Sequence, residues 1–580
     1  MEVYLTTRQS SCVNAMKIGR RKPVLTLLTI LVIGIIIYQA SVLLYTPNET
    51  TWKVGTKNYS YIFVNQIGYL ANHKKYAIVR TNLNLLNYKY TVRDLIHGTE
   101  INATITRDLG AGYGFKHHYL LEFDDLPPGT YVIIIGNATS TPFTVLDYSL
   151  FSNLTEDAAL FFELNRCGKA TKFHEECHID DGIIYNGPLK GTHVNITGGW
   201  HDAGDYLKFT STIAETVILL EETLLYGRPK NETIIVREIL WGLDFLEKTW
   251  IPEHETLIYI VGNQTDHELG FRLPEEDTLR NRPIYVCEEN KGANIAGLVS
   301  SALSLGYILQ SKSLINESEN NWLDIALEVY NFGLRNLEVQ ENGLGDWIAY
   351  PEYGFEDDMA LASILLYNIT KNQTYYQNAV NFHTEFYQKT DVSTTVSNIF
   401  ATLHLSENGY ESTLPFYGDI EWFWDNANHD PLYYPYDEYF WSSVPAMVSV
   451  AVETWAYEKI SEDSQYNALI DYIHNYIFGI NQWGISFVSG YGNIYPKNLH
   501  HQILYLRNIT IPGILAEGGA PKSLLEEYGI YILPDDDDPF ALFQSNEAFY
   551  QDVYWNYITN EPTIRTQAYL IFFISTCLSS

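Results

Sequence analysis

Hydrophobic positions divide the chain into three regions with different spacings. Residues 24–45 form one apolar run, broken only by scattered Thr, Gln39 and Ser41, that is long enough to cross a bilayer as a helix. Between residues 59 and 147, short β-branched and aromatic runs alternate with turns. After residue 148, apolar residues recur at i, i+3/i+4 and i+7, which is typical of helices. The pattern predicts a multidomain protein with a transmembrane helix, a small all-β domain and a large all-α domain.

Basic residues set the expected orientation of the apolar run. By the positive-inside rule, residues 1–23 form a cytoplasmic tail, 24–45 a signal anchor and 46–58 an external linker. A cleaved signal peptide is the alternative, but the run is long for one and no small-x-small cleavage site follows it. The basic residues are Lys17, Arg20, Arg21 and Lys22.

The two downstream regions differ in the spacing of their apolar residues and in the residues that end each predicted element. Runs at 61–64, 76–79 and 131–135, separated by turns at 110–112 and 127–129, predict a β-sandwich over residues 59–147. Apolar faces at 217–224, 295–309, 323–334, 448–455 and 469–477 predict helices within 148–580, and Gly479 is placed to end the last of them. Periodicity alone leaves a bundle, a solenoid and a toroid open.

The composition of the chain limits the kinds of molecule that it is expected to bind. A net charge of -34 argues against nucleic acid. The 45 tyrosines and only 18% charged residues suit carbohydrate binding, although an ordinary acidic secreted surface explains them as well. Five cysteines do not form a disulfide framework. The N-x-[ST] glycosylation triplets, all on the expected external side, begin at Asn48, Asn58, Asn102, Asn137, Asn153, Asn195, Asn231, Asn263, Asn316, Asn368, Asn372 and Asn508.

The stretch 198–206, GGWHDAGDY, carries the strongest chemical signal. Asp202 and Asp205 stand three residues apart around a small Ala-Gly step that permits a tight turn. Trp200 and Tyr206 flank them and offer flat faces on which a sugar ring stacks. Paired carboxyl groups suit glycoside hydrolysis, which also needs a second, distant acid. An Asp-rich surface turn or a weak calcium loop is the alternative.

This stretch resembles the DAGD signature of glycoside hydrolase family 9, the inverting cellulases. The resemblance implies an (α/α)6 barrel in which Asp205 is the base that activates water and Asp202 helps to hold that water. Residues 64–69 and 141–145 resemble the first and last strands of the immunoglobulin-like module found in one branch of the family. We therefore expect an immunoglobulin-like β-sandwich over 59–147 and the catalytic barrel over 148–580.

A possible metal site lies beside the acids. Two thiols and two imidazoles make a tetrahedral zinc set, and a Cys167–Cys177 disulfide is the alternative. The family branch has a structural zinc site whose four positions match here, although Cys167 and Cys177 are closer in sequence than is usual. The residues are Cys167, Cys177, His178 and His201.

Two other segments resemble the family more loosely, and a third is rich in aromatic residues. His267, in Asp-His-Glu, resembles a segment beside the substrate cleft. Asp357 and Asp358 resemble a segment that binds calcium in relatives, although acids at a helix start also act as simple caps. Trp422 and Trp424 are either aromatic platforms along a glucan or buried loop anchors.

The C-terminal part supplies the remaining candidates. The segment SFVSGYG followed by His500 resembles the family's histidine signature, and it implies that His500 contacts the sugar. Gln502 stands where the family has Arg, which weakens the case for plain cellulose as the substrate. Glu547, in Asn546-Glu547, resembles the general acid; Glu517 and Glu561 are weaker rivals.

The sequence therefore predicts a membrane-anchored, external, inverting glycosidase of cellulose or a related β-glucan. Two alternatives remain open. One is a hydrolase of another β-linked sugar, a glucosaminide or xyloglucan. The other is a non-catalytic carbohydrate-binding protein on the same scaffold. A structural zinc ion is expected, and calcium is a further option.

Overall fold

The computed structural model describes residues 59–146, 151–316, 320–345, 347–352, 354–389, 394–410 and 414–579. The predicted cytoplasmic tail, signal anchor and linker lie outside the described residues.

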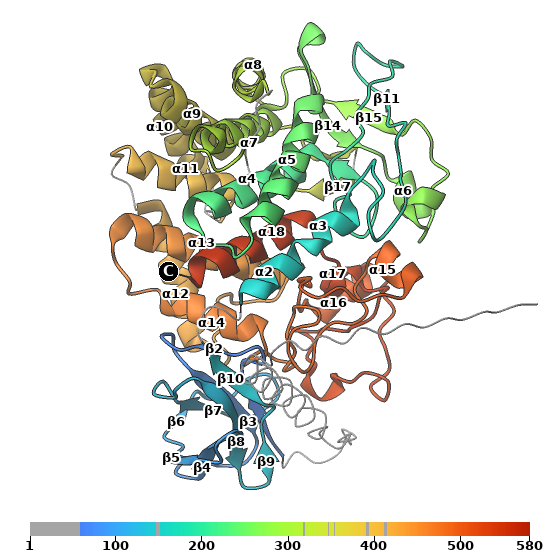
Figure 1. Cartoon of the computed structure of the whole chain (residues 1–580). Coiled ribbons are helices and arrows are strands. Elements are labelled where there is room, and N and C mark those ends of the chain that lie inside the picture. Colours follow the sequence, from blue (N-terminus) through green and yellow to red (C-terminus); the bar gives the residue numbers. More distant parts are fainter. Residues whose placement is uncertain are drawn as a thin grey trace, which may run out of the picture. The chain divides into compact units, whose positions relative to one another are not determined.

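The first described region is a sandwich of two mostly antiparallel sheets (Figure 1). One sheet has the strand order β1-β3-β7-β6, and the other has β2-β10-β8-β4-β5 with β9 paired to β8. Alternate residues such as Val79, Tyr119 and Ile133 are buried between the sheets. The strands are β1 (Ser60–Phe63), β2 (Tyr69–Leu70), β3 (Tyr76–Thr81), β4 (Lys89–Asp94), β5 (Glu100–Thr104), β6 (Arg107–Asp108), β7 (His117–Glu122), β8 (Gly129–Ile135), β9 (Ala138–Thr139) and β10 (Phe143–Leu146).

The second region is mainly helical, and its helices include all five of those predicted from periodicity. The last predicted helix ends at Ile477, and Gly479 follows with a φ of 133°. The helices are α2 (Ser152–Ala158), α3 (Leu160–Asn165), α4 (Thr210–Tyr226), α5 (Glu232–Thr249), α6 (Thr265–Glu268), α7 (Ala293–Ser311), α8 (Trp322–Arg335), α9 (Glu356–Thr370), α10 (Gln373–Lys389), α11 (Val396–Glu407), α12 (Leu414–His429), α13 (Ser443–Ser461), α14 (Ala468–Ile477), α15 (Gln502–Arg507), α16 (Lys522–Glu527), α17 (Tyr557–Asn560) and α18 (Ile564–Phe572).

Six of the described helices pack in a closed ring, in the order α4-α7-α9-α11-α13-α18 and back to α4. Other helices pack behind them: α5 and α8 against α7, α10 against α9, and α12 and α14 against α13. Inner helices are apolar almost all round because they have neighbours on every side. Of the bundle, solenoid and toroid that periodicity left open, the closed ring of helices is the toroid.

Helix α7 shows how strong this burial is. It is long and apolar enough to cross a membrane, and it is the one such helix within the described part of the chain. Because 83% of its most apolar window is buried inside the protein, it is a core helix of the ring. By contrast, the outer helix α10 buries only Ala379, His383 and Phe386 among its described side chains.

The all-α expectation for this region is incomplete, because the loops at one end of the ring carry small sheets. One sheet has the order β11-β15-β14-β12, with β13 paired to β14, and the other pairs β16 with β17. Strand β12 follows Tyr206 directly, so this sheet positions the predicted catalytic stretch. The strands are β11 (Ile183–Ile184), β12 (Lys208–Phe209), β13 (Trp250–Ile251), β14 (Thr256–Val261), β15 (Pro283–Val286), β16 (Asn342–Leu344) and β17 (Trp347–Tyr350).

Polar contacts join the sandwich to the helical region. The Asn65 side-chain amide donates to Asn475 Oδ1 at 3.0 Å, and His73 Nδ1 lies 2.7 Å from Asp471 Oδ1. The buried Arg80 guanidinium donates to the carbonyl of Gln482 and covers the Phe115 ring, 4.6 Å from its centroid. Burial lowers the pKa of Arg80 to about 10, and the hydrogen bond and the ring contact offset part of this desolvation cost while they link the sandwich to the helical region.

Candidate active site

Several site residues lie just before the N-termini of inner helices. Asp202 precedes α4, Tyr350 precedes α9, and Glu561 precedes α18. Helix N-termini carry partial positive charge and therefore stabilise nearby anions. We call Asp202, Asp205 and Glu561 the carboxylate cluster.

The turn that carries the two aspartates depends on Gly204. A Cβ atom there would lie 2.5 Å from the carbonyl oxygen of His500, so only glycine fits. This close approach brings the Asp202–Asp205 turn against the segment that carries His500. The Gly204 N–H also lies 3.3 Å from Glu561 Oε1, to which it donates. The chain is thus held so that three distant segments meet.

Asp202 is fixed by two hydroxyl groups. Thr212 Oγ1 donates to Asp202 Oδ1 at 2.5 Å, and the Tyr350 hydroxyl donates to Asp202 Oδ2. Burial raises the pKa of Asp202, and these two hydrogen bonds oppose the rise. Neither Thr212 nor Tyr350 carries a motif that sequence analysis could have recognised.

Asp205 has one satisfied oxygen and one free oxygen. Oδ2 lies 3.2 Å from His267 Nε2, while Oδ1 is buried and has no hydrogen-bond partner among the described residues. Burial and the charges of Asp266, Glu561 and Asp202 raise its pKa well above the usual range. An unpaired buried carboxylate oxygen is costly unless something binds it, and a water molecule at this point suits a general base. His267, predicted to lie beside the substrate cleft, contacts Asp205 in the carboxylate cluster.

Glu561, which is far from Asp205 in sequence, is the carboxyl group that the fold brings next to Gly204 and His500. Its side chain is 20% exposed, and Oε1 lies 3.9 Å from His500 Nε2. Burial raises the pKa of Glu561 to about 7, so the carboxyl keeps its proton to a higher pH than an ordinary glutamate does. A carboxyl of this kind can act as a general acid near neutral pH.

Glu547 is placed differently from what the sequence predicted. It is exposed on the loop after residues 541–543, whereas Glu561 lies beside Gly204 and His500. The preference for Glu547 over Glu561 is therefore corrected by the geometry. The missed signal was the Asn-Glu dipeptide nearest the C-terminus, Asn560-Glu561, which lies just before the last inner helix.

His500 faces the carboxylate cluster as a neutral ring. Its Nδ1–H donates to the carbonyl of Tyr554 at 2.6 Å, which leaves Nε2 as an acceptor on the side of Glu561. Burial lowers the pKa of His500 to about 4. Gln502 accepts a hydrogen bond from the Arg272 N–H at 2.8 Å, and Arg507 pairs with Glu275. The missing family arginine is thus not replaced by Arg507 at this point.

Two aromatic predictions fail because the side chains are buried. Trp200 is 0% exposed and packs on Phe162, and Tyr206 is 1% exposed and packs on His201. Neither offers a face to a sugar. Their apolar surfaces instead pack in the core beside the turn.

Trp422 and Trp424 lie on helix α12 rather than in a loop. Trp422 is 44% exposed and contacts Phe423 and Tyr436, while Trp424 contacts Tyr466 and stacks on Tyr472. None of these neighbours belongs to the carboxylate cluster. For Trp424 the geometry favours the packing interpretation over a sugar platform.

Three further acids of the helical region are buried. Glu517, the other rival for the acid role, is 2% exposed; Ser442 donates to its Oε2, and burial raises its pKa to about 8. Asp357 and Asp358 lie in the first turn of α9 and accept hydrogen bonds from Thr395 (2.7 Å) and Ser397 (2.5 Å). Thr395 and Ser397 lie at the start of α11, so these contacts join α9 to α11, and both the capping and the calcium interpretations stay predictions.

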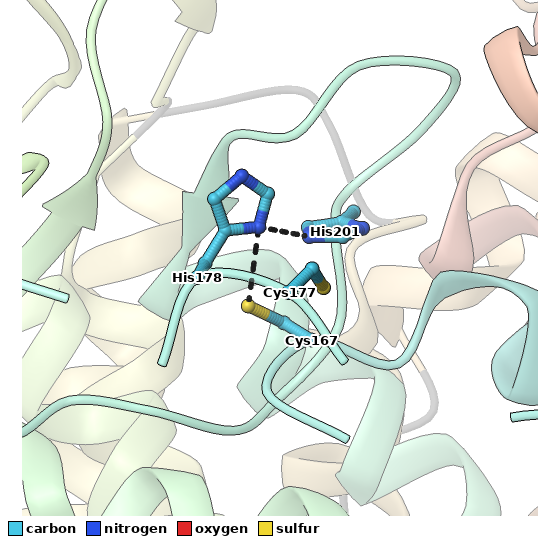
Figure 2. Close-up of side chains that lie close together, drawn as sticks. All are labelled: Cys167, Cys177, His178 and His201. Carbon is cyan, nitrogen blue, oxygen red and sulfur yellow. Dashed lines mark hydrogen bonds between the residues drawn. The ribbon is translucent and has the colours of Figure 1, made fainter. Parts of the chain in front are cut away.

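The four predicted metal ligands converge (Figure 2). One ligand atom from each of Cys167, Cys177, His178 and His201 lies within 4.8 Å of the others, and all four residues are buried. His178 Nδ1 is 3.2 Å from His201 Nε2 and 3.9 Å from Cys167 Sγ. We call this group the Cys/His cluster.

The Cys/His cluster has the composition and support of a metal site. Cys167 and Cys177 are free thiols, and two sulfurs with two ring nitrogens form a set that zinc binds tetrahedrally. The remaining nitrogen of His178, Nε2, donates to Asp277 Oδ2 at 3.1 Å, which is the outer hydrogen bond that metal-binding histidines commonly make. The residues therefore fit a zinc ion.

The helical ring with buried carboxyl groups at the N-termini of its inner helices defines the class: a glycoside hydrolase of the α/α-barrel type. Comparison with family models agrees. Residues 151–574 match the model of glycosyl hydrolase family 9, and residues 57–140 match the cellulase N-terminal Ig-like domain. The chain belongs to glycosyl hydrolase family 9, and it is an enzyme of the cellulase type with an N-terminal immunoglobulin-like module.

Curated relatives and solved structures agree with this membership. Endoglucanase 15 of Arabidopsis thaliana is 24% identical over 417 residues, covering 62% of this chain and 80% of the relative. Endoglucanase A of Bacillus pumilus is 24% identical over 385 residues, covering 61% and 57%. A metagenome-derived family 9 endoglucanase superposes with a TM-score of 0.72 at 20% identity, over 90% of this chain and 99% of that one. A zinc-binding triple mutant of endoglucanase J30 gives a TM-score of 0.71 at 19% identity, over 87% and 98%.

Proposed function

We propose that this protein is an inverting glycosidase that cleaves β-1,4-glucosidic bonds of cellulose or a related β-glucan on the outside of the cell. The observation that carries the proposal is the meeting of Asp205 and Glu561 at Gly204 and His500, each with its pKa raised. The endoglucanase names of the relatives support the choice of substrate.

The chemistry assigns different tasks to the two carboxyl groups. Asp205 Oδ1, which lacks a partner, accepts a proton from the attacking water. Asp202, held by Thr212 and Tyr350, helps to position that water. Glu561 carries a proton and transfers it to the departing glycosidic oxygen. The neutral His500 accepts a hydrogen bond from a sugar hydroxyl through Nε2.

The Cys/His cluster lies next to the turn that carries the catalytic aspartates. His201 immediately precedes Asp202, and Cys167, Cys177 and His178 come from the preceding loop. We propose that the cluster holds a structural zinc ion, which when bound would tie this loop to the turn that carries the catalytic aspartates. The zinc-binding variant of the structural neighbour J30 supports this.

The location of the enzyme rests on the sequence. The basic residues before the apolar run 24–45 favour a single-pass membrane protein with a cytoplasmic N-terminus and an external catalytic domain. Protease added to intact cells should then remove the catalytic domain. Full protection of that domain would reverse the orientation.

The test of the activity is a reducing-sugar assay over a polysaccharide panel, followed by proton NMR of the first product. We expect cleavage of β-glucan with release of the α anomer, because inversion turns a β linkage into an α product. A β anomer would falsify the inverting assignment. Turnover only of glucosaminides or xyloglucan would favour the other hydrolase, and binding without any turnover would favour a carbohydrate-binding protein.

A further inference from the structure

Exposed apolar side chains are concentrated in the first strands of the immunoglobulin-like sandwich. Of the twenty large hydrophobic side chains that are exposed within the described part of the chain, seven lie between residues 59 and 101. Four of these lie where β1 begins and where the chain leaves β3 for β4, and Tyr59 and Tyr88 are the most exposed of the four, at 60% and 59%. We call Tyr59, Leu83, Leu86 and Tyr88 the end patch.

Strand pairing brings Tyr59 next to the loop between β3 and β4, residues 82–88. Ser60, at the start of β1, pairs with Thr81, the last residue of β3, and their hydroxyl oxygens lie 3.3 Å apart. The Lys116 N–H donates to Asn82 Oδ1 at 3.0 Å, which adds the segment before β7 to the same end of the sandwich. The end patch and Lys116 therefore lie together at one end of the sandwich.

The loop 82–88 holds its leucines in different environments. Leu85 is 6% exposed, and its N–H donates to the Tyr119 hydroxyl in the sandwich core at 3.0 Å. Asn87 adopts a left-handed conformation, with a φ of 68°, which asparagine tolerates better than most residues. The backbone thus directs Leu85 into the core and leaves Leu83 and Leu86, on either side of it, exposed. Exposed apolar groups that gather at one place mark contacts with a protein or a membrane.

The charge of this part of the chain suits a membrane surface. No acidic residue occurs between residues 50 and 93, although the whole chain has 70 acidic residues, and seven Lys and Arg residues occur there. Lys89 and Lys116 are exposed beside the end patch. Leucine and tyrosine side chains flanked by lysines are typical of protein surfaces that lie in the headgroup region of a bilayer, where the apolar groups enter the lipid and the ammonium groups stay in water.

The predicted linker joins the sandwich at Tyr59, which belongs to the end patch. Residues 46–58, between the expected signal anchor and Tyr59, can span at most about 45 Å. We propose that the end patch lies in the headgroup region of the membrane that the anchor crosses; this inference rests on the proposed membrane location of the protein. A contact of this kind fixes the sandwich, and the helical region packed on it, relative to the membrane surface.

Fluorescence quenching by labelled lipids tests the proposal. The full-length chain, with an environment-sensitive fluorescent amino acid in place of the exposed Asn84, is reconstituted in phosphatidylcholine vesicles that contain lipids with a nitroxide on the headgroup. We expect emission shifted to the blue and strong quenching at this position, because the probe lies among the headgroups. Combined Leu83→Ser, Leu86→Ser and Tyr88→Ser replacements should remove most of the quenching, since they delete apolar surface without changing the core.

Ile96 provides the matched control, because it is exposed at the opposite end of β4. A probe in place of Ile96 should show little quenching, and quenching as strong as at position 84 would overturn contact through the end patch. Energy transfer between copies labelled at position 84, without quenching by lipid, would show that a second copy covers the end patch and would also overturn the proposal. A chain that floats with the vesicles but shows no quenching at position 84 would reject the end patch and keep the anchor, and a chain that does not float would reject both.

Discussion

Two groups of buried ionisable side chains lie on either side of the turn 198–206, and they differ in how their polar atoms are satisfied. In the Cys/His cluster the ligand atoms face one another, and His178 has an outer partner in Asp277. In the carboxylate cluster, acids of like charge lie together, and Asp205 Oδ1 has no partner among the described residues. The first group is arranged for one small ion and the second for a reacting molecule.

The difference shows how burial can serve two purposes. Inward-facing thiols and imidazoles gain most from a cation that joins them, and the proposed zinc ion would stabilise the loop when bound. In the carboxylate cluster, burial and to a smaller extent the charge of Asp202 raise the pKa of Glu561, which keeps the proposed acid protonated to a higher pH. The following experiments test this contrast between the Cys/His cluster and the carboxylate cluster.

Replacing the proposed acid should have the largest effect. We expect Glu561→Gln to lower kcat on β-glucan by about 10²–10⁴-fold, the usual contribution of a general acid. Glu547→Gln is the matched control, since it changes the exposed glutamate of the other Asn-Glu dipeptide and should leave kcat almost unchanged. Initial-rate kinetics measure both, and the reverse ranking would restore Glu547 as the acid.

The leaving group should separate the two carboxyl roles. Glu561→Ala should retain much more activity on an activated aryl glycoside than on glucan, because a good leaving group departs without a proton. Asp205→Ala should be slow on both, since water activation is needed each time. Equal impairment of the Glu561 variant on both substrates would place its role elsewhere.

Breaking the Cys/His cluster should affect stability more than chemistry. We expect about one zinc per chain in the wild type and much less in His201→Ala, with a melting temperature lower by several degrees. Elemental analysis and thermal unfolding of the full-length chain are the measurements. His174→Ala serves as a control because its ring is hydrogen-bonded to the Glu175 carbonyl outside the cluster. Absence of zinc together with a Cys167–Cys177 disulfide by mass spectrometry would refute the site.

The pH profile should report the raised pKa of the acid. Activity requires Glu561 to be protonated, so kcat/KM should fall as pH rises through about 7. An ordinary glutamate would give the fall near 4–5. A decline complete by pH 5 would show that the acid is a solvated carboxyl.

The smallest expected effect is that of replacing Glu517, which should change how the free energy of unfolding depends on pH. Burial raises its folded-state pKa to about 8, so the folded protein binds a proton that the unfolded chain releases at lower pH. Its contribution is fully present below the unfolded pKa and is lost as pH rises towards 8. Glu517→Gln should reduce this decline by up to about 1.4 kcal/mol per pH unit, measured by denaturant unfolding at several pH values. A decline of unchanged slope would contradict the assignment.

Much of the fold follows from local patterns. Period-two runs gave the sandwich, and i, i+3/i+4 spacing gave helices such as α7 and α14, because each residue's partners lie nearby in sequence. Periodicity does not say which helices neighbour each other, so the closed ring required the tertiary structure. The short strands β11, β12 and β15 were missed because their pairing joins segments far apart in the chain.

The site, like the fold, was predicted in part from the sequence and in part only from the tertiary structure. The Asp202–Asp205 motif and the four Cys/His residues were recognisable because their residue types and spacing suggest one chemistry. The sequence favoured Glu547 over Glu561, although both follow an asparagine; only the approach of residue 561 to Gly204 and His500 reverses that preference. Trp200 and Tyr206 could be read from sequence as sugar platforms, and only the packing around them shows that they are buried. The chemical groups were therefore determined by the sequence, while their exposure, partners and pKa values were decided by segments that the fold brings together.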